Sequence, residues 1–199
     1  DKEALKRGTS VYLIDQVIPM LPAELSNGAC SLNPDVDRLT LSVDMEIDGS
    51  GKVVRHEIYE SVIRSRFRMI YDDVSEILEN NAVDLISRYT GIIPELRMME
   101  ELAAILRKKR LERGSLDFDL NEAAIVLDEG GVPVSIELVE RRTANKMIEE
   151  FMLAANETVA EHYFWTELPF VYRIHEKPDP EKIEEFKAFI ASFGCHLKG

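Results

Sequence analysis

One group of polar side chains falls within a predicted helix over residues 143–165. Asn145, Glu149 and Asn156 share one stripe with Met152, because an α-helix turns about 100° per residue. A buried carboxylate between two amides could bind a hydroxyl, a base edge or a metal-bound water. The same side chains could equally form a structural hydrogen-bonded network that joins the helix to a loop, since buried polar groups need partners in any protein. Spacing leaves both interpretations open.

Arginine recurs at every second position at Arg64, Arg66 and Arg68. We expect one long or bent strand over residues 52–70, and a spacing of two places side chains on one face of a strand. Three aligned guanidinium groups beside a groove would suit phosphates. The alternative is a solvated face paired with the local acids. Tyr71 follows this strand, where it could stack on a base or lie in the core.

A third candidate is the segment of residues 19–34, which is rich in Pro, Ser and Asn. Long loops inside a compact domain are often functional. Two prolines stiffen the start of this loop and Tyr12 lies before it, so the loop could clamp an extended polymer. It could equally be a packed connection.

Other common catalytic patterns do not occur in the sequence. There is no Gly-rich phosphate loop and no serine in a nucleophile-elbow context. The four histidines have no zinc-ligand spacing with cysteine or with each other. From the residues alone, we predict an α+β domain with a possible polymer groove.

The elements that would position these side chains are a mixture of hairpins and helices. This mixture predicts an α+β fold with a mixed or antiparallel sheet and packed helices. A turn is expected over residues 48–51, between the first two long strands. The expected strands are 39–47, 52–70, 116–120, 124–127 and 134–139, and the expected helices are 2–7, 72–79, 94–113, 143–165 and 180–192. Asp179 and Pro180 are expected to cap and open the last of these helices.

Composition bounds the class of protein. The 199 residues include 24 Lys+Arg against 37 Asp+Glu, a net charge of −13 that by itself disfavours a free-standing nucleic-acid binder. The length predicts one large domain, or a domain with an appendage. No apolar run approaches the roughly 20 residues that span a bilayer, so no membrane partner is expected. Two cysteines indicate a reducing compartment, and we expect a cytoplasmic protein.

Several longer stretches carry the motifs of a known family. They cover residues 7–38, 63–71, 113–118, 144–157 and 172–178. Together they resemble the catalytic, or RNB, domain of the ribonuclease II and ribonuclease R family, and the ribonuclease R branch most closely. The resemblance implies that residues 1–199 are the central part of one such catalytic domain.

The resemblance also implies an activity and a set of contacts. Members of this family are processive 3′→5′ exoribonucleases that thread single-stranded RNA into a channel and release nucleoside monophosphates with two Mg²⁺ ions. The parent enzyme is expected to be monomeric. By the family's motifs, Tyr71 stacks near the 3′-terminal nucleotide, Glu149 contacts that nucleotide, and Tyr12 clamps the RNA a few bases away. Phe118 lies near the family's other stacking aromatic. With the residues considered above, the predicted substrate-binding set is Tyr12, Tyr71, Glu149, Phe118, Arg64, Arg66, Asn145 and Asn156.

Two family motifs are absent from these 199 residues. They are the aspartate cluster that binds magnesium, with the pattern D-x(5)-D-x-D-D, and the catalytic arginine in a motif like R-R-Y-P-D. The flanking cold-shock-like and S1 domains are absent too, and the sequence begins without methionine. We therefore expect a domain truncated at both ends, with no catalytic residue and no metal ligand of its own.

This chain alone is expected to be inactive as a nuclease and to bind RNA weakly. A truncated paralogue that serves as an RNA-binding or scaffold module is the alternative. The resemblance implies that the acidic charge belongs to the catalytic domain, while basic flanking domains gather the RNA.

Overall fold

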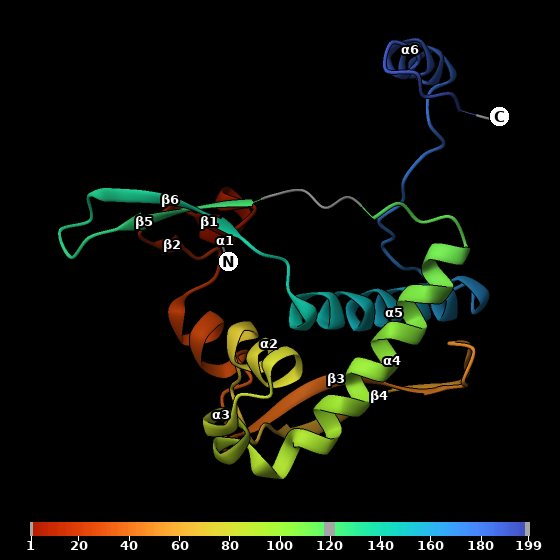
Figure 1. Cartoon of the computed structure of the whole chain (residues 1–199). Helices are drawn as coiled ribbons and strands as arrows, with labels where there is room; N and C mark the ends of the chain where they lie inside the picture. The colour runs from red at the N-terminus through yellow and green to blue at the C-terminus, as the bar shows by residue number, and fades with distance from the viewer. Residues whose placement is uncertain (1, 118–121, 198–199) are drawn as a thin grey trace. The chain divides into compact units, whose positions relative to one another are not determined.

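The computed structural model of the chain describes residues 2–117 and 122–197 (Figure 1). The chain forms two compact units, residues 1–161 and 162–199, and each is described by itself. The elements, in chain order, are α1 (Lys2–Arg7), β1 (Val11–Tyr12), β2 (Val17–Ile18), the π-helical turn η1 (Glu24–Ala29), β3 (Asp37–Ile47), β4 (Val53–Arg64), α2 (Tyr71–Asn80), α3 (Val83–Arg88), the 3₁₀ turn η2 (Thr90–Ile92), α4 (Ile93–Glu112), β5 (Glu122–Leu127), β6 (Pro133–Val139), α5 (Thr143–Trp165) and α6 (Pro180–Ala191).

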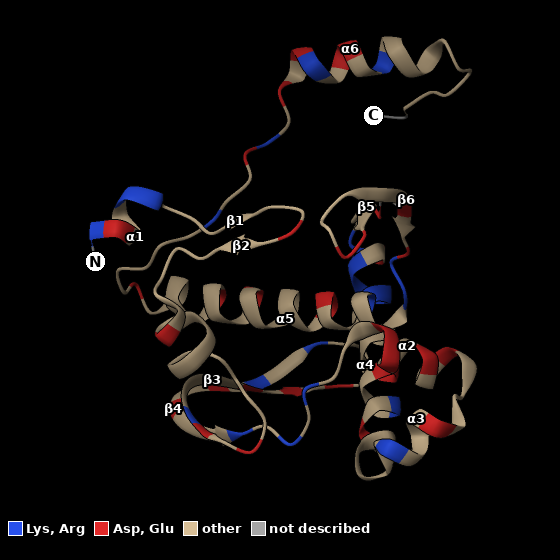
Figure 2. Ribbon diagram, turned by 90° about the vertical axis from the view of Figure 1, so that its left-hand side faces the viewer, with Lys and Arg blue, Asp and Glu red and all other residues tan. Residues whose placement is uncertain are grey.

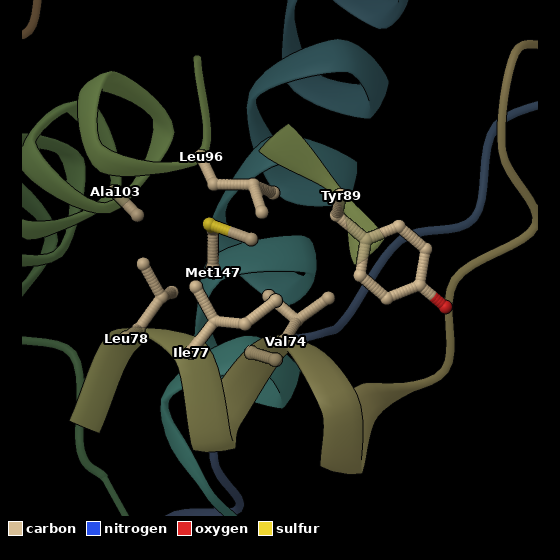
Figure 3. Packing of buried hydrophobic residues seen from close by; sticks show 8 residues of the cluster. Val74, Ile77, Leu78, Tyr89, Leu96, Ala103 and Met147 are labelled. Carbon is tan, nitrogen blue, oxygen red and sulfur yellow. The ribbon is translucent and has the colours of Figure 1, made fainter. Parts of the chain in front are cut away.

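The buried core of the first unit lies where α2, α4 and the start of α5 meet. Val74, Ile77 and Leu78 follow the i, i+3, i+4 spacing of one helix face, and all three are buried. Figure 3 shows the Met147 side chain of α5 between Leu96 of α4 and Ile77 of α2. The remaining buried members of the cluster are Tyr89, Leu96, Ala103 and Ala144.

An arginine of α4 joins the end of α2 to this core. Arg97 donates to the backbone carbonyls of Leu78 and Ile77, at 2.8 and 3.1 Å. It also donates to Oδ1 of Asn81, at 2.7 Å. Asn81 has a φ of 51°, in the left-handed region in which helices often end. Arg97 therefore satisfies carbonyls that the helix end leaves without an intrahelical partner.

The β3–β4 hairpin docks on α4 through its turn. Gly51 is buried with a φ of +77°, and a Cβ built there would lie 3.2 Å from Cγ2 of Ile105. Lys109 donates from Nζ to the Gly51 carbonyl at 2.7 Å. At the same end of the hairpin, the Thr158 hydroxyl of α5 donates to the Met45 sulfur at 3.3 Å. Figures 1 and 2 both show α5 passing over this hairpin.

Burial along β3 is not what its apolar pattern suggests. Apolar and polar residues alternate along this strand, but Leu39 and Leu41 are largely exposed. The polar residues between and beside them are partly buried, and their hydroxyls form a chain. Ser61 Oγ lies 2.7 Å from Oγ1 of Thr40 and 2.6 Å from Oγ of Ser42. The described residues therefore cover the hydroxyl-bearing face of this half of the hairpin more than the apolar one.

The predicted α+β class is confirmed, and each described strand pairs with its neighbour in antiparallel fashion. In the described part of the chain they form three separate two-stranded sheets, β1–β2, β3–β4 and β5–β6. The predicted strand over residues 116–120 is not formed at 116–117, and its remaining residues lie outside the described ones. Every residue of β6 is exposed, so the β5–β6 hairpin adds no buried side chain to the core through that strand.

The second unit begins in the last turn of α5 and ends after α6. Tyr163 and Phe170 stack with ring centroids 4.6 Å apart, and Tyr172 meets Phe170 edge-on at 5.2 Å. The predicted cap of α6 is present, because Oδ1 of Asp179 accepts from the Glu181 backbone N–H at 2.9 Å. Among the described helices, none is both long enough and apolar enough to cross a membrane.

Candidate functional site

Glu149 is held at the surface of α5 by an arginine that precedes the helix. Arg141 donates from Nε to Oε1 of Glu149 at 2.9 Å, and its Nη2 bonds to Oε2. Arg141 lies two residues before α5 begins, and its side chain reaches Glu149, eight positions later in the chain. The Glu149 side chain remains 38% exposed. It is an ionised acceptor with part of its surface open to solvent.

A second carboxylate extends this pair. Arg141 donates from Nη1 to Oδ1 of Asp117 at 2.8 Å, and Arg107 of α4 binds Oδ2 of the same carboxylate. The hydrogen bond from Arg141 lowers the pKa of Glu149 and also that of Asp117. We call Arg107, Asp117, Arg141 and Glu149 the arginine–carboxylate chain, whose four charges sum to zero.

The buried acid of this region is Glu150, which directly follows Glu149 and was not predicted from the sequence. Glu150 is only 3% exposed, and it accepts from Arg110 at 3.1 Å from Nε and at 2.6 Å from Nη2. Arg110 also donates from Nη1 to the Ser115 hydroxyl at 2.7 Å. One signal was available, because Glu150 lies three residues after Met147 and so interrupts the apolar stripe of the helix. Its partner lies 40 residues away, which no local pattern reveals.

A separate ion pair ties the start of α5 to α2. Glu79 accepts from the Thr143 backbone N–H at 2.9 Å and from Nη2 of Arg142 at 2.7 Å. These bonds, led by the one from the backbone N–H, lower the pKa of Glu79 to about 2. Figure 2 shows acidic residues on α2 and basic ones on α4. The bonds to Glu79 therefore hold the start of α5 against α2.

The two asparagines of the predicted stripe do not join Glu149. Asn145 accepts from the Arg142 backbone N–H at 3.2 Å, which places its amide at the beginning of α5. Asn156 is exposed, as is Met152 between them. The expectation of a buried stripe is therefore wrong, because the face of α5 that enters the core carries Ala144 and Met147 instead. For Glu149 and Asn145, hydrogen bonds to the segment before the helix are the observed arrangement.

Both predicted tyrosines are accessible. Tyr71 is the first residue of α2 and is 51% exposed, while Tyr12 lies in β1 and is 78% exposed. The alternative of a core tyrosine therefore does not hold for Tyr71. The buried tyrosine of this region is Tyr89, whose hydroxyl donates to Oδ2 of Asp73 at 3.0 Å and whose ring meets Phe67 edge-on. Tyr12 and Tyr71 both offer an aromatic face on which a base could stack.

The predicted row of three arginines is wrong in its geometry. Strand β4 ends at Arg64, because β3 begins at its partner Asp37 and leaves the later residues without a ladder. Ser65 makes only an isolated bridge to Pro34, and the chain then turns toward α2. Arg64 donates from Nε to Oδ1 of Asp37 at 2.7 Å, in an exposed pair. Arg66 and Arg68 are exposed beyond the strand.

The loop over residues 19–34 is held in place by an arginine. Arg38 donates from Nε to the Ser31 carbonyl at 2.8 Å and from Nη2 to the Gly28 carbonyl at 3.2 Å. The middle of the loop is the π-helical turn η1, so the segment has a defined shape and is anchored to β3. The last of the predicted contacts, Phe118, lies outside the described residues.

The chemistry available here is binding. Among the described residues, no group of three or more His, Cys, Asp or Glu side chains could hold a metal ion. The magnesium pair implied by the family resemblance therefore finds no ligand set in the described part, and we derive no step through it. A half-exposed carboxylate can accept hydrogen bonds from sugar hydroxyls, and exposed phenols can stack on bases.

Comparison with known proteins identifies the class. The RNB domain family matches residues 1–197, so this chain belongs to the RNB domain family. Ribonuclease R of Thermotoga maritima is 51% identical over the whole chain, and ribonuclease R 1 of Lactococcus lactis is 47% identical. The structure of Mycoplasma genitalium RNase R in complex with ribose-methylated single-stranded RNA matches 98% of this chain, with a TM-score of 0.88 and 31% identity.

The shares of the longer chains are much smaller. This chain spans 28% of the Thermotoga protein, 24% of the Lactococcus protein and 30% of the Mycoplasma chain. The activities of those longer proteins are therefore proposed for this chain and are not assigned to it directly.

Proposed function

We propose that this chain is part of a 3′→5′ exoribonuclease that degrades single-stranded RNA to nucleoside monophosphates, and that it supplies contacts to the 3′ end of the RNA. The observation that carries the proposal is the match of nearly the whole chain to the structure of an RNase R in complex with ribose-methylated single-stranded RNA. In this proposal Glu149 accepts a hydrogen bond from the terminal nucleotide, while Tyr71 and Tyr12 stack on bases.

The described side chains support a role in binding. Glu149 is ionised and partly exposed, and both tyrosines are accessible. Arg64 and Arg66 are exposed cations that would contact phosphates. The ligands of Mg²⁺ would come from residues other than the described ones, so this chain would contribute substrate binding without the reacting centre.

The experiment follows a 5′-labelled oligoadenylate with the full-length gene product and with the 199-residue chain. We expect the full-length protein to shorten the RNA from its 3′ end and release AMP, and the 199-residue chain to release none. Loss of activity in EDTA, restored by Mg²⁺, is expected for the full-length protein. Internal cleavage of the RNA, or no cleavage by the full-length protein with Mg²⁺ present, would overturn the proposal.

Tyr71→Ala in the full-length gene product tests the stacking contact proposed for this residue. It removes the exposed ring and should weaken RNA affinity by roughly tenfold, because stacking of one base contributes about 1–3 kcal/mol. Tyr172→Ala, in the second unit, is the matched control and should leave affinity unchanged. A Tyr71→Ala protein that binds as well as the wild type would remove this residue from the site.

A further inference from the structure

We propose that Arg141 is a positioning residue for RNA binding, and that it acts by holding the Glu149 carboxylate in the orientation that receives the terminal nucleotide. This inference rests on the proposed function, because it assigns to Glu149 a contact with RNA. Arg141 belongs to neither a helix nor a strand, and it lies between the end of β6 and the start of α5.

The hydrogen bonds of Arg141 exclude a direct role in phosphate binding. Its Nε and Nη2 point to Glu149, and its Nη1 points to Asp117. The guanidinium therefore meets two carboxylates with its fork, and its side chain is only 24% exposed. One positive charge shared between two carboxylates leaves no net positive charge here to attract a phosphate. Its effect on a ligand must pass through the groups that it holds.

The orientation of Arg141 is itself fixed from the far side. Arg107 of α4 binds the other oxygen of Asp117, so that carboxylate is shared by arginines from two parts of the chain. The side chains of Arg107 and Asp117 are 27% and 22% exposed. The arginine–carboxylate chain thus runs from α4 to the surface of α5, and Glu149 is its most exposed member.

The carboxylate keeps capacity for a ligand. An ionised carboxylate has about four acceptor positions, and the described hydrogen bonds to Glu149 all come from Arg141. The side chain also remains partly exposed. A hydroxyl of the RNA could therefore bind the free positions while the guanidinium prevents the side chain from rotating away. Such preorganisation reduces the entropic cost of ordering the Glu149 side chain when RNA binds.

The test is a double-mutant cycle in the full-length gene product, with affinity for a fluorescent single-stranded oligoadenylate as the readout. Glu149→Gln should weaken binding about tenfold, as expected for the loss of one charge-assisted hydrogen bond. Arg141→Ala should weaken it by a similar factor. The double variant should also be about tenfold weaker, and not about a hundredfold weaker, because Arg141 acts only through Glu149.

A pH series gives a readout that a purely structural role would not move. Removal of Arg141 takes away the main cause of the lowered Glu149 pKa, while Asp117 raises that pKa and Arg110 lowers it. The acid limb of the affinity profile should therefore shift to higher pH in Arg141→Ala. Arg113→Ala breaks the exposed pair with Glu157 and is the control that should change neither affinity nor the profile.

The outcomes are distinguishable. If the wild type neither binds nor cleaves RNA, the proposed function fails, and this inference fails with it. If Glu149→Gln weakens binding but Arg141→Ala does not, or if the two effects add in the double variant, only the positioning role is overturned. Asp117→Asn is a second variant that distinguishes loss of the Arg141–Glu149 pair from general misfolding. It keeps that pair and should weaken binding less than Arg141→Ala.

Discussion

Arg110 and Glu150 pair between α4 and α5 with side chains only 15% and 3% exposed, whereas Arg64 and Asp37 pair on the β3–β4 hairpin with 62% and 59% exposed. The chemical groups are the same and their surroundings differ. Removal of one partner of a buried pair leaves a charge without solvent, while water replaces either partner of an exposed pair. The buried pair therefore fixes the helices, and the exposed arginine is free to exchange its acid for another anion.

The Arg141–Glu149 pair lies between these limits, with 24% and 38% of the side chains exposed. It is buried enough to be fixed and exposed enough to meet a ligand. The degree of burial, more than the residue types, therefore separates structural, positioning and binding roles among these ion pairs.

The largest effect is expected at the buried pair. Glu150→Gln leaves the Arg110 charge without its carboxylate and should lower the free energy of unfolding by about 3–5 kcal/mol, measured by urea denaturation. Glu157→Gln, in the exposed pair with Arg113, is the control and should cost at most about 1 kcal/mol. A small loss for Glu150→Gln would show that burial does not separate the two kinds of pair.

A comparable loss is expected where α5 enters the core beside this pair. Met147→Ala removes a buried side chain between α2 and α4 and should cost about 2–5 kcal/mol. Met152→Ala changes an exposed methionine of the same helix and should stay within about 0.5 kcal/mol of wild type. Equal losses in the two variants would contradict the described burial of α5.

A smaller, pH-dependent effect is expected at Glu79. Its pKa of about 2 lies below the ordinary value of 4.5, so its ionised form stabilises the fold above about pH 4.5. That stabilisation is lost as the pH falls from 4.5 toward 2. Glu79→Gln should therefore be less stable than wild type at pH 7, and the difference should shrink through this range. Thermal unfolding across the pH series checks it, and a constant difference would exclude Glu79 as the cause.

The smallest effect on stability is expected at the exposed pair. Arg64→Ala should leave the thermal midpoint unchanged, because water replaces the lost partner. If Arg64 contacts a phosphate in the full-length protein, the slope of log affinity against log salt should fall by about 1. An unchanged slope together with unchanged affinity would remove Arg64 from the predicted contacts, and Arg66→Ala tests its neighbour in the same way.

Much of the secondary structure follows from local signals. Helix α5 spans the predicted residues, and α6 begins at the predicted Asp179–Pro180 cap, because periodicity and capping act over a few neighbouring positions. The end of β4 was not predictable in this way. It depends on where β3 begins, almost thirty positions earlier in the chain, and nothing within residues 64–70 announces that the partner strand has run out.

The sequence by itself determined the α+β class and, through its motifs, the RNB family, because both depend on residue types in short stretches. It also singled out Glu149, Tyr71 and Tyr12. Only the tertiary structure decided which acid of α5 is buried, which arginine holds Glu149 and that Arg64 stands apart from Arg66. Those choices depend on contacts between residues up to 40 positions apart, and burial exists only once the helices have packed.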